Sequence, residues 1–163
     1  MERISKHNYY LDIAQVVAER STCLRRKYGA IIVKEDVLIS SGFNGSPRGR
    51  ANCSDLNSCY RDKLNIPRGT RYELCRSVHS EVNAVISASR EQMLGATLYM
   101  VCVSPEDGSV VPNTTCCIMC KRVVINAGIS KVVIRDDKEN YRIIDVNSWI
   151  EDDDSLSGSM GEY

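Results

Sequence analysis

The chain is organised around two short segments, HSE at residues 79–81 and CIMC at residues 117–120. One histidine and two cysteines provide three of the four ligands that zinc usually takes in proteins, and three protein ligands leave a fourth position for water. An open fourth position is typical of catalytic zinc, whereas structural zinc has four protein ligands. The two segments therefore predict a catalytic zinc site, which the surrounding sequence must position.

His79, Cys117 and Cys120 are the predicted zinc ligands, and Glu81 is the predicted catalytic carboxylate. A Cys-x-x-Cys pair at a helix start places both sulfurs on one side of the first turn, where the helix dipole and free N–H groups lower the thiol pKa. Zinc lowers the pKa of a bound water toward ~7, and a nearby carboxylate can move its proton to a substrate. The pattern therefore indicates hydrolytic chemistry.

Two other interpretations of these residues stay open. A lone Cys-x-x-Cys pair in an α/β protein can be a redox pair, and a single histidine is most often an ordinary hydrogen-bonded side chain. Cys116 also lies one helical turn from Cys120 and could replace Cys117 as a ligand. The Cys-x-x-Cys spacing favours Cys117 and Cys120.

The composition indicates one compact domain that acts on a small molecule. The chain has 163 residues, 43% of them apolar, and we expect one domain at residues 1–150. Lys plus Arg and Asp plus Glu both number 21, so no overall basic field would hold long nucleic acid. We expect a small-molecule nucleotide substrate and no nucleic-acid partner.

No membrane or export signal stands out in the sequence. Residues 1–7 lack the apolar centre of a signal peptide, and no run approaches the roughly 18 apolar residues of a membrane span. We therefore expect a cytoplasmic protein without membrane contact. In that compartment the eight cysteines are expected to be metal ligands or buried residues, not disulfides.

Strands and helices alternate along the chain, which predicts an α/β sheet with helices on its faces. The apolar spacing predicts a helix at 8–20, strands at 29–33 and 37–41, a helix at 78–89, a strand at 96–103, a helix at 117–127, and strands at 131–134 and 141–146. Residues 48–76 are irregular and rich in charge, so we expect an insertion or lobe there. The acidic segment 151–163 is too poor in apolar residues to order itself.

His-x-Glu followed by Cys-x-x-Cys is the signature of zinc nucleobase deaminases, and the surrounding sequence resembles the deoxycytidylate (dCMP) deaminase family. The resemblance covers about residues 8–135 and rests on Arg20-Ser21-Thr22-Cys23 with Arg25, Gly29-Ala30, GFNGSP at 42–47, Cys75-Arg76, HSEVNA at 79–84, Cys120-Lys121 and INAGI at 125–129. It implies a three-layer α/β/α sandwich with a five-stranded mixed sheet, assembled as a homohexamer.

The resemblance also implies a reaction, the conversion of dCMP to dUMP and ammonia, which supplies dUMP for thymidylate synthesis. Asn44 would contact the sugar, and Arg25 or Arg26 the 5′-phosphate, because a guanidinium can donate two hydrogen bonds to phosphate. Many relatives are activated by dCTP and inhibited by dTTP, with magnesium as a companion ion. The loop at residues 42–47 would bind such an effector, although a tight turn that supports a strand end explains it equally well.

Three features depart from the family pattern. Cys116 stands where relatives have proline, Ser80 replaces a common alanine, and residues 104–113 are inserted before the zinc-binding helix. The insertion borders the active site and bears on substrate choice. Two alternatives therefore stay open: a deaminase of another small cytosine- or purine-containing nucleoside or nucleotide, and a non-catalytic zinc protein that binds nucleotides. The intact Glu81 argues against the second.

Four further cysteines, Cys23, Cys53, Cys59 and Cys75, are predicted to bind a second, structural zinc. Four thiolates without an open position are the arrangement of structural zinc, which would stabilise a loop-rich lobe. Some dCMP deaminases carry a second zinc on mixed ligands. By that resemblance Cys23 and Cys53 match its cysteines, while Cys59 and Cys75 would replace its histidines. The alternative is four small buried residues without metal, because their spacing contains no Cys-x-x-Cys pair.

Overall fold

The computed structural model describes residues 1–153 and contains one mixed five-stranded sheet in the order β2-β1-β3-β4-β5. Strands β3 and β4 are parallel, and the other neighbouring pairs are antiparallel. The strands are β1 (Lys27–Lys34), β2 (Val37–Phe43), β3 (Thr97–Val103), β4 (Lys131–Arg135) and β5 (Tyr141–Asp145). The helices are α1 (Lys6–Ala18), α2 (Cys53–Leu56), α3 (Tyr60–Lys63), η1 (Tyr72–Leu74), α4 (Ser80–Ile86), α5 (Arg90–Met93), α6 (Ile118–Ala127) and α7 (Val146–Glu151).

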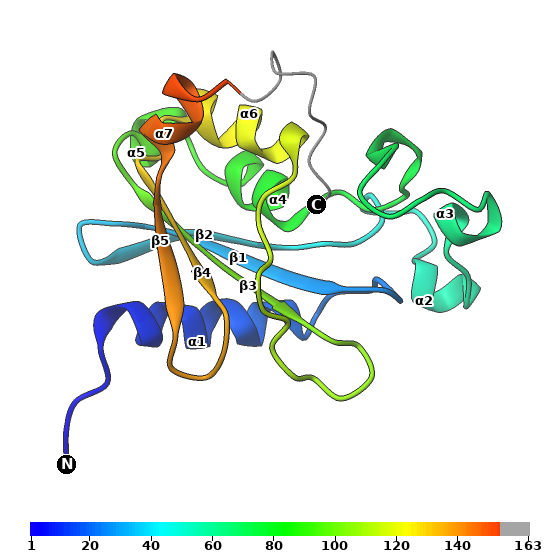
Figure 1. Cartoon of the computed structure of the whole chain (residues 1–163), viewed down its shortest axis with the longest axis horizontal. Coiled ribbons are helices and arrows are strands. Elements are labelled where there is room, and N and C mark those ends of the chain that lie inside the picture. Colours follow the sequence, from blue (N-terminus) through cyan, green and yellow to red (C-terminus); the bar gives the residue numbers. More distant parts are fainter. Residues whose placement is uncertain (154–163) are drawn as a thin grey trace.

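Helices cover both faces of the sheet. Helix α1 lies on one face, and α4, α5, α6 and α7 lie on the other (Figure 1). The predicted three-layer α/β/α sandwich with a five-stranded mixed sheet is confirmed. Of the acidic segment at 151–163, only the first three residues are described, so the prediction that it stays unordered lies mostly outside the described residues.

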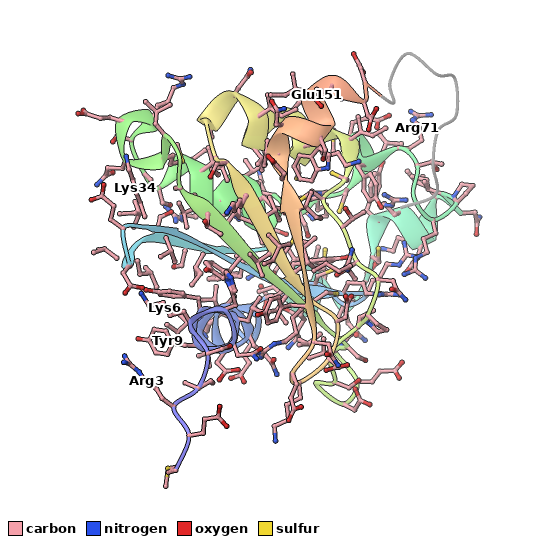
Figure 2. The ribbon with its side chains drawn as sticks, turned by 60° about the vertical axis from the view of Figure 1, so that its left-hand side comes forward. Arg3, Lys6, Tyr9, Lys34, Arg71 and Glu151 are labelled. Carbon is pink, nitrogen blue, oxygen red and sulfur yellow. The ribbon has the colours of Figure 1, made fainter. Side chains whose placement is uncertain are left out.

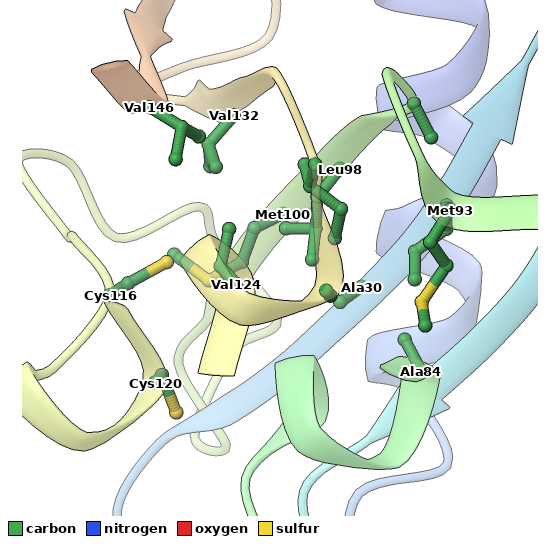
Figure 3. Packing of buried hydrophobic residues seen from close by; sticks show 14 of the residues in the cluster. Ala30, Ala84, Met93, Leu98, Met100, Cys116, Cys120, Val124, Val132 and Val146 are labelled. Carbon is green, nitrogen blue, oxygen red and sulfur yellow. The ribbon is translucent and has the colours of Figure 1, made fainter. Parts of the chain in front are cut away.

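Strand β3 explains why the sheet needs both layers of helices. Tyr99 and Val101 pack in the cluster beneath α1, whereas Leu98 and Met100 pack in the cluster on the opposite face (Figure 3). Successive side chains of a strand point to opposite faces, so a strand that is covered on both sides must be apolar throughout. The unbroken apolar run at residues 96–103 therefore marks a central strand.

The helix predicted at 78–89 is present but shorter, as α4, and a separate short helix, α5, follows it that was not predicted. Helix α4 ends at Ile86, and α5 begins after Ser89. The side chain of Ser89 accepts a hydrogen bond from the backbone N–H of Gln92, and the Gln92 side chain accepts one from the backbone of Ser89. This capping box satisfies the free N–H groups of a new helix start, which favours a fresh helix over a continued one.

Gly42 brings β2 into direct contact with α4. A Cβ atom at Gly42 would lie 2.4 Å from the backbone nitrogen of Ala84 and 2.5 Å from the carbonyl oxygen of Ser80. Real side chains do not approach backbone so closely, so only glycine permits this packing. The contact fixes the N-terminal end of α4, where the segment at residues 79–81 lies.

Residues 48–76, called the lobe below, extend from one end of the sheet (Figure 1). The lobe contains α2, α3 and η1, each about one turn long. Only Cys53 and Arg61 are buried within it. Since neither is a large apolar side chain, the lobe has no hydrophobic core of its own.

Charged side chains project from the surface of the sandwich and of the lobe. Lys6, Lys34 and Glu151 project from the sandwich, as does Arg71 from the lobe (Figure 2). Within residues 1–153, no helix combines the length and the apolar character that are needed to cross a membrane.

Candidate metal centre and active-site cavity

His79, Cys117 and Cys120 meet where two helices begin. His79 is the N-cap residue of α4, and Cys117 is the N-cap residue of α6. The Nδ1 atom of His79 lies 3.4 Å from Sγ of Cys117 and 3.3 Å from Sγ of Cys120. Within residues 1–153, this is the one group of three or more histidine, cysteine or acidic side chains whose donor atoms all lie within 4.8 Å of one another.

The three donor atoms fit a zinc ion. In a tetrahedral site with Zn–S bonds of about 2.3 Å and Zn–N bonds of about 2.1 Å, the nitrogen and each sulfur lie about 3.6 Å apart. The observed separations of 3.4 Å and 3.3 Å are slightly shorter, so a small outward movement would accommodate the ion. One imidazole and two thiolates form a ligand set of catalytic zinc sites, with a position left for water.

The protonation of these groups also suits a cation. The pKa of Cys117 is lowered to about 4, firstly by the hydrogen bond from Cys120 and then, against the effect of burial, by His79. The same hydrogen bond and burial raise the pKa of Cys120. Burial alone would lower the pKa of His79, but its hydrogen bond with Cys117 and the charge of Glu81 raise it overall. A metal that binds all three groups therefore displaces protons, as zinc does at thiol ligands.

Glu81 lies beside this group and is only 4% exposed. The Ser80 hydroxyl donates a hydrogen bond to its Oε2 atom over 3.1 Å. Burial, and then the Glu81 charge, raise the pKa of the Cys116 thiol well above its usual value, so this thiol stays protonated and hydrogen-bonds to the carboxylate. Cys116 lies outside the metal-ligand group. The two unusual residues that flank the ligands, Ser80 and Cys116, thus both contact Glu81.

A cavity of about 640 Å³ opens over the metal centre. One part of its wall consists of His79, Glu81 and Cys117, a second comes from residues 104–106 and 111–115, and a third comes from the lobe. The volume is within the range of small-molecule sites. The segment inserted at residues 104–113 therefore lies where a substrate would be bound.

Asn44 and the two arginines predicted to bind substrate all line this cavity. Asn44 is held by the protein: its Oδ1 atom accepts from the backbone N–H of Tyr28 at 2.8 Å, and its Nδ2 atom donates to the carbonyl of Arg26 at 2.9 Å. Arg25 forms an ion pair of 3.4 Å with Asp62 of the lobe. One N–H of Asn44 stays free of these bonds, so contact with a sugar remains a prediction, as does phosphate binding by Arg25 or Arg26.

The four cysteines of the predicted second zinc site, Cys23, Cys53, Cys59 and Cys75, line the same cavity. The pKa of Cys53 is raised firstly by burial and then by the charges of the other three, so the four lie near one another. No three of their sulfur atoms lie within 4.8 Å of one another in the described structure. The structure thus brings the four cysteines to the same cavity without gathering three of their sulfurs at one point.

Two further residues, Arg61 and Tyr72, line the cavity although the sequence did not mark them as candidates. The Tyr72 ring contacts the His79 ring edge-on, with 5.4 Å between the centroids, and the Arg61 guanidinium lies over the Tyr72 ring at 4.6 Å. Neither residue belongs to a motif or to a periodic pattern. Only the folded lobe places them beside the metal centre.

Comparison with known proteins assigns the chain to a family. A model of the cytidine and deoxycytidylate deaminase zinc-binding region matches residues 4–135. The chain belongs to this family. Membership in a zinc-binding family, together with the His-Cys-Cys donor set, indicates zinc at the metal centre.

Several deoxycytidylate deaminases are similar in sequence. That of Mycobacterium phage D29 is 36% identical over 138 residues, which are 82% of this chain and 96% of the phage protein. That of Schizosaccharomyces pombe is 30% identical over 131 residues, which are 80% of this chain but 37% of the yeast protein. The chain thus spans nearly the whole phage relative and less than half of the yeast relative.

Solved structures support the same fold. The dCMP deaminase of cyanophage S-TIM5 matches with a TM-score of 0.57 at 23% identity and covers 83% of this chain and 86% of its own. The cytidine deaminase of Burkholderia pseudomallei matches with a TM-score of 0.57 at 18% identity and covers 89% of this chain and 95% of its own. At such identities the two structures support the fold alone.

Proposed function

We propose that this protein is a zinc-dependent deaminase that converts dCMP and water into dUMP and ammonia. The observation that carries the proposal is the meeting of His79, Cys117 and Cys120 beside the buried carboxylate of Glu81 in one cavity. The substrate is taken from the relatives named deoxycytidylate deaminase. In addition, the cyanophage S-TIM5 enzyme has been crystallised with dCMP and dUMP.

Glu81 moves the protons in this reaction. Zinc held by His79, Cys117 and Cys120 would lower the pKa of a water molecule toward ~7. Glu81 takes a proton from the attacking water as the bond from its oxygen to carbon 4 of cytosine forms, and passes that proton to ring nitrogen 3. When the bond from carbon 4 to the amino nitrogen breaks, Glu81 transfers the remaining proton of the water to the leaving amine. The oxygen stays on the ring, and ammonia leaves.

The experiment that tests this proposal measures ammonia released from dCMP, CMP, dCTP, deoxycytidine, cytosine and a purine nucleotide by the zinc-loaded full chain. Fastest turnover of dCMP, abolished by chelation of the metal, supports the proposal. No ammonia from any compound would favour a non-catalytic zinc protein that binds nucleotides.

A different small nucleotide is the second candidate substrate. The observation that favours it is the inserted segment, from which Ser104, Pro105 and Glu106 line the cavity. Because this segment could reshape the pocket around the base or sugar, the fastest substrate in the same assay decides between the candidates.

We also propose that Cys23, Cys53, Cys59 and Cys75 bind a second, structural zinc. The support is local: Sγ of Cys23 accepts a hydrogen bond from the backbone N–H of Arg25 at 3.5 Å, and Sγ of Cys75 accepts one from that of Ser77 at 3.4 Å. Such bonds stabilise thiolates. Metal analysis should give about two zinc ions per chain. One ion per chain, unchanged in a Cys59→Ala, Cys75→Ala double variant, would exclude the site.

Assembly and regulation are proposed from the family resemblance. A homohexamer would be detected by light scattering of the full chain. Activation by dCTP and inhibition by dTTP, with magnesium, would be detected by adding each nucleotide to the dCMP assay. The proposed location is the cytoplasm.

A further inference from the structure

Arg61 is a buried cation for which residues 1–153 provide no matching anion. It is 3% exposed, and its Nη2 atom donates to the carbonyl of Pro67 at 3.0 Å, while its Nε and Nη1 atoms have no hydrogen-bond partner. Within residues 1–153, no carboxylate lies within ion-pair distance of it. A guanidinium stays charged at all ordinary pH values, and burying a charge is costly unless it is paired. The structure therefore holds a charged group ready for an anion.

Arg61 belongs to the wall of the active-site cavity. Arg61 is one of the residues that line it, and stacking over the Tyr72 ring at 4.6 Å fixes its position. Tyr72 in turn contacts His79, so Arg61 lies about 10 Å or less from the histidine ring but is separated from it by one aromatic side chain. An anion at Arg61 would thus be close to the metal centre without being a metal ligand.

Four further arginines, Arg25, Arg26, Arg68 and Arg76, line the cavity, against two carboxylates, Glu81 and Glu106. This excess of positive charge suits a phosphate. Arg25 is already paired with Asp62, and its side chain is 36% exposed. Arg61 is therefore the more suitable anchor, since it is both buried and unpaired.

We propose that Arg61 binds the 5′-phosphate of the nucleotide substrate and so makes the enzyme select nucleotides over nucleosides. The proposal rests on the proposed function. It also gives the lobe a role in substrate recognition, because Arg61 and Tyr72 both belong to it.

The test compares kcat/KM for dCMP with kcat/KM for deoxycytidine in the zinc-loaded full chain. In Arg61→Met the dCMP to deoxycytidine ratio should fall by about 30- to 100-fold, as expected for lost charge-assisted hydrogen bonds. In Arg61→Lys, which keeps the charge but loses the planar fork, it should fall by about tenfold. The matched control is Arg71→Met, because Arg71 belongs to the same lobe, is exposed and forms an ion pair with Glu73 (Figure 2). Its ratio should stay within about twofold of wild type.

A structural role for Arg61 would lower both kcat/KM values together and leave their ratio unchanged, and that result overturns the proposal. If Arg61→Met does not fold, an unchanged ratio in Arg61→Lys has the same meaning. A wild type that deaminates neither compound contradicts the proposed function instead. In that case, calorimetry of dUMP and deoxyuridine binding to wild type and Arg61→Met tests whether Arg61 binds the phosphate. A selective loss of dUMP affinity in Arg61→Met supports the phosphate site, and equal affinities in wild type and variant overturn it.

Discussion

The metal centre and the lobe form parts of one cavity wall, but they are held in place by different forces. Cys117, Cys120 and Ala84 belong to the same buried cluster as the sheet residues Leu98 and Met100 (Figure 3). In the lobe, only Cys53 and Arg61 are buried, and each helix is about one turn long. The first region is held by hydrophobic packing on the sheet, the second by hydrogen bonds, cation–π contact and, as proposed, metal.

This difference suggests a division of roles. Catalytic groups must keep their relative positions to within a fraction of an ångström, which favours helix ends packed on a rigid sheet. Substrate recognition can rely on segments with fewer buried contacts, which open and close more readily. Changes at the metal centre should therefore act on kcat or on stability, while changes in the lobe should act on substrate preference.

The largest effect is expected from Glu81→Gln, which removes the proposed proton carrier and keeps a side chain of the same size. We expect kcat for dCMP to fall by about 10³- to 10⁴-fold, because general acid–base catalysis contributes up to about that factor. Zinc content, measured by atomic emission, should stay near that of wild type. The control is His79→Ala, which should lose zinc. Equal zinc loss in both variants would contradict the separation of ligand and proton carrier.

The second effect concerns the free energy of unfolding. It compares one glycine packed beside the metal centre with one glycine in the lobe. Gly42→Ala should destabilise the protein by about 3 kcal/mol, because its Cβ would lie 2.4 Å from the backbone nitrogen of Ala84, and packed backbone cannot give way cheaply. In Gly49→Ala, at the start of the lobe, the added Cβ meets nothing within 4 Å. The only cost is that alanine must adopt the positive φ of 86°, which should destabilise the protein by about 1 kcal/mol. Urea unfolding measures both. Equal losses would show that close packing does not distinguish the two regions.

The same division separates what the sequence could predict from what it could not. The sheet followed from apolar runs, and the grouping of His79, Cys117 and Cys120 followed from their spacing, because both patterns are local. Helix α5 was missed although Ser89 and Gln92 carry a capping-box pattern. Short α7 was also missed, because it follows β5 directly from its N-cap Asp145.

Arg61 could not be predicted because nothing in the sequence distinguishes it from the neighbouring charged residues of the lobe. Its burial depends on Tyr72 and Pro67, which contact it only after the lobe has folded. The sequence predicted instead that Arg25 or Arg26 would bind phosphate. The pairing of Arg25 with Asp62 is likewise a tertiary contact that no spacing rule shows. Similarly, only the structure shows that Ser80 and Cys116 both touch Glu81.

These contacts give a third, smaller effect. Ser80→Ala and Cys116→Ala should each lower kcat for dCMP by about three- to tenfold with little change in KM, since each removes one hydrogen bond that positions Glu81. Cys116→Ser keeps a donor of similar size and should recover most of the loss. If Cys116→Ser is as slow as Cys116→Ala, the thiol acts by filling space and not by positioning the carboxylate.

The smallest effect concerns the segment just before Cys117, at Asn113 and Thr114, and the side chains that attach it to the sheet. Asp136 accepts hydrogen bonds from the backbone N–H of Asn113 at 2.8 Å and from Nε of Arg142 at 2.7 Å. Arg142 also donates to the carbonyl of Thr114 at 2.6 Å. The pKa of Asp136 is lowered from 3.8, firstly by its hydrogen bond with Arg142 and, against the effect of burial, by the Asn113 N–H.

A lowered carboxyl pKa means that the folded state favours the charged form, so this contribution to stability is complete above the unfolded pKa of about 3.8 and is lost as pH falls through the lower folded value. Asp136→Asn should therefore lower Tm by about 2 °C at pH 7, and the difference from wild type should shrink as pH is reduced from 4 to 2. Scanning calorimetry at several pH values measures it. A difference in Tm that persists at pH 2 would mean that the geometry of the Asp136 side chain, and not its charge, holds the segment beside the metal centre. The segment would then be held by packing, as the metal centre is, and not by polar contacts, as the lobe is.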